Sequence, residues 1–196
     1  MRTEKFRLHL NLENRSRFPI DIVWENAKDL EHVATLHRKT NKAFELLYVG
    51  RESQLHEYDV MFYQSLRRLV IFPLHSFGFR KIQSVYNLVQ IECIPLLGLT
   101  VVLNSLLKPL DNLDYPTQLV DEVVIEGPFW MKFFSPLIAR SLRRHTQIQC
   151  QEDESYRERR NELVQRGIRL PYRLYSSSRM ERISALFKEK LNTCLE

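Results

Sequence analysis

The sequence predicts an α+β fold in which a curved antiparallel sheet wraps around a long C-terminal helix. Two observations support this prediction. Apolar and polar residues alternate in short stretches from residue 42 to residue 126, as expected for half-buried strands. Apolar residues then recur at helical spacing from Phe129 to Arg166. A helix that only partly fills the concave face of such a sheet leaves an apolar cavity there.

The composition is that of a single folded domain. The chain has 196 residues, 44% of them hydrophobic, which is enough for a substantial core. Its net charge of +5 suits an acidic partner or an anionic membrane surface, but no nucleic-acid-binding motif accompanies it. We therefore expect a protein that does not bind nucleic acid. The three cysteines are scattered, which indicates a reducing compartment. The sequence has neither the apolar core of a signal peptide nor an apolar run long enough to span a bilayer, so we also expect a cytoplasmic protein.

The N-terminal part of the chain is predicted to contain a strand followed by a helix. Residues 1–17 alternate weakly and suit either a loose arm or an edge strand. Phe18–Glu25 is rich in β-branched and aromatic residues and is predicted to be a strand. Asn26–Thr40 changes to helical spacing, with Leu30 and Val33 on its apolar side.

The middle of the chain is predicted to be an antiparallel meander. Turn residues separate its strands at Gly50–Glu52, Ser76–Gly78 and Pro109–Pro116. His75 is expected in a loop after Pro73. The predicted strands are Phe44–Val49, Leu55–Tyr63, Arg67–Phe72, Ile82–Ile94, Leu99–Leu107 and Gln118–Ile125.

The C-terminal part is predicted to be mostly helical. Gly127-Pro128 ends the sheet, and Pro136 indicates a kink or a restart within the helix that follows. Gly167 is a suitable helix stop. We therefore divide the chain into an N-terminal arm (1–17), the main domain (18–171), and a linker with a C-terminal amphipathic helix (172–196).

One motif stands out within ENAKDLEHVATLH. It places Glu25, Asp29, His32 and His37 in the pattern E-x-x-x-D-x-x-H-x-x-x-x-H. Two imidazoles and one carboxylate with open positions suit non-heme Fe(II), and an acidic neighbour can orient a ligand histidine. On an ideal helix the two histidines point about 140° apart, so joint ligation requires a break between them. The alternative is an amphipathic helix with two ordinary histidines.

This segment resembles the iron-binding motif of the catalytic domain of Rieske-type ring-hydroxylating oxygenases. That domain belongs to the helix-grip (SRPBCC) superfamily, which includes START-like proteins. The resemblance implies a helix-grip fold in which His32 and His37 bind mononuclear iron. It also implies that Asp29, three residues before the first histidine, lies on the electron path and serves as a catalytic residue.

The third ligand of that family is an aspartate on the long C-terminal helix. The run CQEDESYRERRNELVQRGIRLP resembles the corresponding segment of the demethylase-like branch, which implies Asp153 as the ligand. Glu152 and Glu154 remain alternatives. The resemblance extends from about Phe18 to Pro171, but only the two short motifs are specific.

The chain departs from the family in one respect. A complete enzyme of this kind carries a Rieske domain with C-x-H and C-x-x-H pairs, and this sequence contains neither. The resemblance therefore implies Fe(II) without a Rieske cluster in this chain, and a separate Rieske or ferredoxin-type protein as the electron donor. An iron used for another chemistry and a relic site are the alternatives.

Three functional hypotheses follow. The first is an oxidoreductase that resembles a Rieske oxygenase and oxidises a hydrophobic or aromatic small molecule. The second is a non-catalytic helix-grip protein that binds a lipid or another hydrophobic ligand. In both, alternation suggests that the cavity is lined by Phe44, Tyr58, Phe62, Tyr86, Val101 and Phe133.

The third hypothesis is peripheral membrane attachment, or a protein contact, through the amphipathic segments Phe129–His145 and Arg179–Leu195. The resemblance also implies a homo-oligomer, since trimers are common in that family. Nucleotide-binding and hydrolase motifs are absent from the sequence, and His56 and His145 are expected to be ordinary polar positions.

Overall fold

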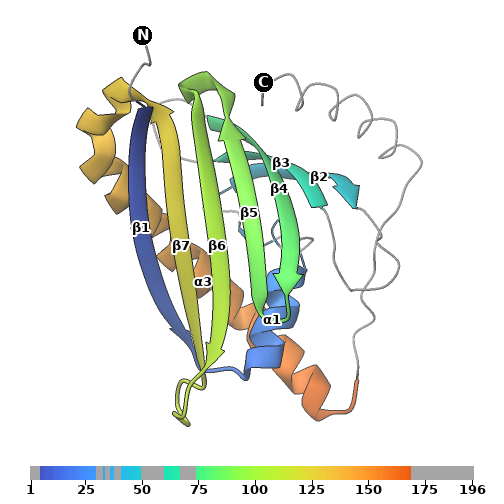
Figure 1. Cartoon of the computed structure of the whole chain (residues 1–196). Coiled ribbons are helices and arrows are strands. Elements are labelled where there is room, and N and C mark those ends of the chain that lie inside the picture. The colour runs from blue at the N-terminus through green and yellow to red at the C-terminus, as the bar shows by residue number, and fades with distance from the viewer. Residues whose placement is uncertain are drawn as a thin grey trace.

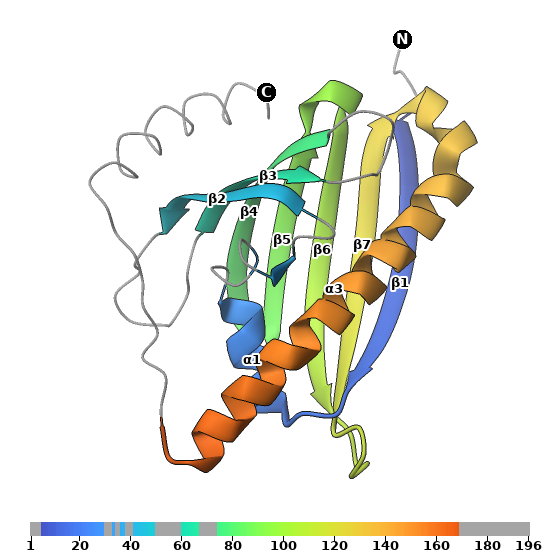
Figure 2. The same cartoon turned by 180° about the vertical axis from the view of Figure 1, so that it is seen from behind.

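The structure is a computed structural model that describes residues 5–29, 33, 36–37, 41–49, 60–66 and 74–168. Its main feature is a seven-stranded antiparallel sheet with the order β1-β7-β6-β5-β4-β3-β2. The sheet curves around one long helix, α3, which crosses its concave face (Figures 1 and 2). The predicted α+β architecture is therefore confirmed.

The N-terminal residues form the edge strand β1, Lys5–Ser16. Of the two alternatives for this segment, a loose arm or an edge strand, the second is therefore correct. β1 pairs with β7, Thr117–Pro128, along its whole length, from Lys5 opposite Pro128 to Ser16 opposite Thr117. This register turns Phe6, Leu10 and Leu12 into the core. The proposed division of the chain into arm, domain and C-terminal helix stays a prediction.

The strand predicted at Phe18–Glu25 is wrong, because Ile20–Lys28 forms the helix α1. Pro19 precedes the helix, and its carbonyl accepts the backbone N–H groups of Ile22 and Val23 at 3.0 and 3.2 Å. Tertiary packing outweighs the β-propensity of these residues. The buried side of α1 packs on the sheet in a cluster formed by Phe18, Ile22, Val23, Trp24, Ile82, Leu88 and Leu107.

The helix predicted at Asn26–Thr40 is seen in part. Residues 26–28 complete α1, Asp29 is extended, and Val33 and Leu36 are again helical. The backbone therefore leaves the helical conformation at Asp29. His37 is also described, and the remaining residues of this segment, His32 among them, lie outside the described residues.

The other strands form a meander, much as predicted. One correction is that the predicted strand Ile82–Ile94 is a hairpin that turns at Val85 and Tyr86, where Tyr86 has a φ of 65°. The predicted strand Arg67–Phe72 and the turn at Gly50–Glu52 lie outside the described residues. The observed strands are β2 Asn41–Val49, β3 Val60–Leu66, β4 Leu74–Ser84, β5 Asn87–Ile94 and β6 Leu99–Pro109.

The turn predicted at Ser76–Gly78 is also wrong, since these residues lie inside β4. Gly78 is placed there by packing: a Cβ atom at this position would lie only 2.1 Å from Cζ of Phe62. His75 is likewise a strand residue, not a loop residue. Its ring stacks on Tyr63, whose hydroxyl lies 2.5 Å from His75 Nδ1.

The C-terminal helical region begins where the sheet ends, as predicted. Phe129–Phe134 forms the short 3₁₀ helix η2, and Ser135–Gln165 forms α3, which has 31 residues. Pro136 lies in the first turn of α3, so it starts the helix and does not kink it. Gly167, with a φ of 75°, ends it.

The predicted linker and the helix Arg179–Leu195 lie outside the described residues. Among the helices that the structure describes, none is long and apolar enough to cross a bilayer.

Candidate ligand-binding cavity

A cavity of about 680 Å³ lies between the concave face of the sheet and α3. Its walls are mostly apolar, and the predicted residues Phe44, Phe62 and Val101 line it. Two of the other predicted lining residues are corrected. Tyr86 packs edge-to-face against Trp24 outside the cavity, and Phe133 is 78% exposed. Tyr58 lies outside the described residues.

The sheet wall carries a buried carboxyl group at Glu92 of β5. Gln64 donates a hydrogen bond to Glu92 Oε2 at 2.7 Å, Ser76 donates to the same oxygen at 3.2 Å, and Gln90 donates to Oε1. Burial raises the pKa of Glu92, whereas these hydrogen bonds and the charge of Arg80 oppose the rise. Glu92 is therefore a fixed polar group in an apolar wall, and its environment favours the protonated form.

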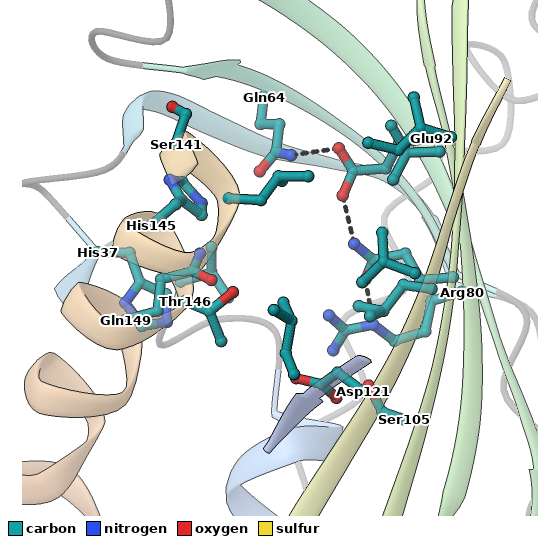
Figure 3. A pocket seen from close by; sticks show the side chains of 18 of the residues that line it. His37, Gln64, Arg80, Glu92, Ser105, Asp121, Ser141, His145, Thr146 and Gln149 are labelled. Atoms are coloured by element: carbon teal, nitrogen blue, oxygen red, sulfur yellow. Dashed lines mark hydrogen bonds between the residues drawn. The ribbon is translucent and has the colours of Figure 1, made fainter. Parts of the chain in front are cut away.

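A second polar group on the sheet wall is formed by Arg80 and Asp121. Arg80 donates from Nε to Gln90 at 2.7 Å and from Nη1 to the carbonyl of Ala27 at 2.8 Å. Ser105 donates to Asp121 Oδ1 at 2.6 Å. Burial raises the pKa of Asp121, and the charge of Arg80 lowers it. Both side chains line the cavity next to the Glu92 group (Figure 3).

The helix wall carries polar residues at every fourth position of α3: Ser141, His145, Gln149 and Asp153. Figure 3 shows the first three across the cavity from the polar groups of the sheet. Burial, and to a smaller extent the nearby His37, lower the pKa of His145 to about 4, so its imidazole is neutral at pH 7. The expectation that His145 is an ordinary polar position is wrong, although its four-residue spacing was visible in the sequence.

The structure brings together two of the residues predicted to bind metal. His37 is 4% exposed and lies against α3 between two carboxylates. Its Nδ1 is 3.1 Å from Glu152 Oε2, and its Nε2 is 3.4 Å from Asp153 Oδ1. Glu154, the other alternative to Asp153 as the carboxylate ligand, pairs with Arg17 at 3.0 Å and does not approach His37 in this way. The pairing of His37 with Asp153 joins segments more than one hundred residues apart.

This pair has a separation that suits two of the three predicted metal ligands. Two donors bound to one ion at about 2.0–2.2 Å lie roughly 3 Å apart, close to the observed separation of His37 Nε2 and Asp153 Oδ1. In the described part of the chain, no group of three His, Cys, Asp or Glu side chains is arranged to hold a metal. The predicted site therefore depends on His32, which lies outside that part.

Asp29 holds the end of α1 against α3. Its Oδ2 accepts hydrogen bonds from the Tyr156 hydroxyl at 2.7 Å and from Arg160 Nη2 at 2.9 Å. Burial and the bond to Asp29 raise the pKa of Tyr156. Glu25 pairs with Lys28 one turn away. The catalytic role predicted for Asp29 stays a prediction.

No family model matches the sequence, and neither does any curated protein. The fold, however, is similar to those of several solved structures. A protein of unknown function from Staphylococcus aureus superposes with a TM-score of 0.58 at 9% identity, over 81% of this chain and 98% of the other. The Zhui aromatase/cyclase from Streptomyces sp. R1128 gives a TM-score of 0.58 at 10% identity, over 79% and 96%.

Dicamba monooxygenase bound to dicamba gives a TM-score of 0.60 at 16% identity and covers 95% of this chain. This chain spans 60% of the dicamba monooxygenase chain. Likeness at such low identity concerns the fold alone. The protein therefore has a helix-grip fold, in which the curved seven-stranded sheet wraps around the long C-terminal helix.

Proposed function

We propose that the protein binds an apolar, aromatic small molecule that carries a hydrogen-bonding group. The observation behind this proposal is the cavity of about 680 Å³, whose apolar walls carry polar groups at a few fixed places. Cavities of this size and character are typical of small-molecule sites. Glu92 and Arg80 on the sheet wall and His145 on the helix wall would orient the ligand, while the apolar side chains bind its body.

The role proposed for Glu92 can be tested with two matched fluorescent probes, pyrene and 1-hydroxypyrene. In Glu92→Leu we expect 1-hydroxypyrene to bind about tenfold more weakly, the cost of one hydrogen bond, and pyrene to bind much as before. Glu92→Gln should retain most of the affinity, since an amide can still donate and accept. The matched control is Glu122→Leu, an exposed position of β7 outside the cavity.

The same titrations can contradict the role of Glu92 or the proposed function. Equal losses for both probes in Glu92→Leu would mean that Glu92 shapes the cavity and does not contact the hydroxyl group. Failure of the wild-type protein to bind either probe saturably would contradict the proposed function itself.

A second candidate function is iron-dependent oxidation of the bound molecule. It is favoured by the separation of 3.4 Å between His37 Nε2 and Asp153 Oδ1. His32, His37 and Asp153 would hold Fe(II) and leave coordination positions open, and bound iron would supply oxygen chemistry with electrons from a separate Rieske or ferredoxin-type donor. The cavity would orient the substrate and exclude water. The hydrogen bond between Glu152 and His37 would fix the orientation of the imidazole.

Metal analysis of anaerobically purified protein tests this candidate. We expect about one iron per chain in the wild type, and a loss of at least about tenfold in His32→Ala, His37→Ala and Asp153→Asn. His75→Ala, which changes an exposed histidine of β4, is the matched control and should keep its iron. A wild-type protein that holds no iron after reconstitution with Fe(II) would leave ligand binding as the function.

A further inference from the structure

A cluster of large apolar side chains is exposed at one end of the molecule. We call it the aromatic rim. Most of its members belong to the amphipathic segment Phe129–His145, and in the structure they face solvent. Its members are Leu96 (70% exposed), Phe129 (46%), Trp130 (48%), Phe133 (78%), Phe134 (49%) and Leu137 (62%).

The rim lies beside one end of the cavity. Leu96 belongs to the short helix η1, Pro95–Leu97, which lies beside the start of η2, since a Cβ on Gly98 would be 3.6 Å from Pro128 Cγ. Both views place η1, η2 and the first turns of α3 at the same end of the sheet (Figures 1 and 2). Trp130, Phe134 and Leu137 also line the cavity, so the rim adjoins it.

Along the segment that carries most of the rim, the charged residues are all cationic. Between Glu126 and Glu152 the sequence contains no Asp or Glu, but it contains Lys132, Arg140, Arg143 and Arg144. All four cationic residues are exposed. Arg140 and Arg144 follow Leu137 at three and seven residues, so they lie on the same side of α3. Lys132 Nζ lies 5.8 Å from the centre of the Phe129 ring.

We propose that the aromatic rim docks on the surface of an anionic lipid bilayer. Exposed apolar patches of this kind mark interaction sites, and aromatic side chains favour the level of the lipid headgroups. Lys and Arg beside them attract anionic headgroups, and their long apolar stems allow them to lie along an apolar surface. The combination of aromatic and cationic side chains complements a membrane in both respects.

A second copy of the chain fits this surface less well. A two-fold interface brings the same patch of both subunits together, so it would set four cationic residues against the same four. No acidic residue of the segment from residue 127 to 151 is available to balance them. Docking on a bilayer avoids this repulsion. It would also let an apolar ligand enter the cavity from the lipid. This consequence rests on the proposed ligand binding, but the docking proposal does not depend on ligand binding.

Flotation of the full chain with lipid vesicles tests the proposal. We expect binding to vesicles of phosphatidylcholine with about 30% phosphatidylserine at low salt, and weaker binding to pure phosphatidylcholine or at about 500 mM salt. The double variant Phe133→Ser/Leu137→Ser should reduce the bound fraction at least about fivefold, because it removes the two most exposed apolar side chains of η2 and α3. Arg140→Gln/Arg144→Gln should act mainly on the phosphatidylserine vesicles.

The matched control is Leu113→Ser. Leu113 is fully exposed and lies between β6 and β7, at the opposite end of the sheet (Figure 1). Circular dichroism shows whether each variant is folded, and pyrene binding by the wild-type protein separates failure of docking from failure of ligand binding. Absence of wild-type binding to anionic vesicles, or equal binding by the Phe133→Ser/Leu137→Ser variant, overturns the proposal. A stable oligomer in light scattering that this variant dissociates would identify the rim as a protein interface instead.

Discussion

Replacing Gly78 by alanine is expected to destabilise the protein by about 2–3 kcal/mol, the cost of overpacking a filled site. A Cβ atom at Gly78 would lie 2.1 Å from Cζ of Phe62 and 2.5 and 2.6 Å from its two Cε atoms. The ring is 1% exposed and stacks on Phe44 with centroids 5.3 Å apart, so it must be displaced. Urea denaturation followed by circular dichroism measures the loss.

The double variant Gly78→Ala/Phe62→Leu identifies the cause. Leucine is smaller than phenylalanine, so we expect the added methyl group to cost less in this background than in the wild type. Gly167→Ala is the control. Gly167 has a positive φ but nothing within 4 Å of an added Cβ, so this change should cost only about 1 kcal/mol of backbone strain, with no dependence on Phe62. If Gly78→Ala costs as much in the Phe62→Leu background, the steric explanation is wrong.

Replacing Arg157 by methionine is expected to cost about 3 kcal/mol, because it removes the cation that pairs with the buried carboxylate of Asp153. The Arg157 side chain is 4% exposed, and its Nη2 lies 3.0 Å from Asp153 Oδ2. Glu152 approaches the same histidine, His37, so the loss of one cation leaves two carboxylates close together in a buried place. Urea denaturation at pH 7 measures the change.

Two further variants make this prediction specific. The double variant Asp153→Leu/Arg157→Met removes both charges and should recover part of the stability. Arg159→Met changes an exposed residue of the same helix, so we expect an effect within about 0.5 kcal/mol. An equal loss in the single and double variants would show that packing, and not charge, is responsible. Arg157→Met also retains all three proposed metal ligands, so its folded fraction should still hold iron.

The class and order of most elements follow from local patterns in the amino-acid sequence. Alternation predicted the meander, helical spacing predicted α3, and Gly127-Pro128 and Gly167 marked where the sheet and the helix end. These signals are local, since each depends on a few neighbouring residues and on the fixed repeat of a strand or a helix. The spacing of the motif singled out His37, whereas Asp153 was identified as a ligand only through a resemblance to a known family.

The errors arose where a distant contact decides the local structure. Phe18–Glu25 has the residues of a strand, but its apolar side chains become buried against the sheet as helix α1. Gly78 suggests a turn, yet it is a strand residue that makes room for the ring of Phe62. In both places the deciding neighbour is far along the chain, and intrinsic propensity is too weak to oppose it.

What each side chain faces depends on the packing of distant elements and is seen only in the folded protein. The tertiary structure placed His145 in the cavity, where burial lowers its pKa to about 4, and it set His37 against Asp153. It also showed that the aromatic residues of η2 lie outside the core. Periodicity identifies the apolar side of a helix but not what covers that side. That depends on how the sheet curves around α3, and curvature is a property of the whole set of packed strands.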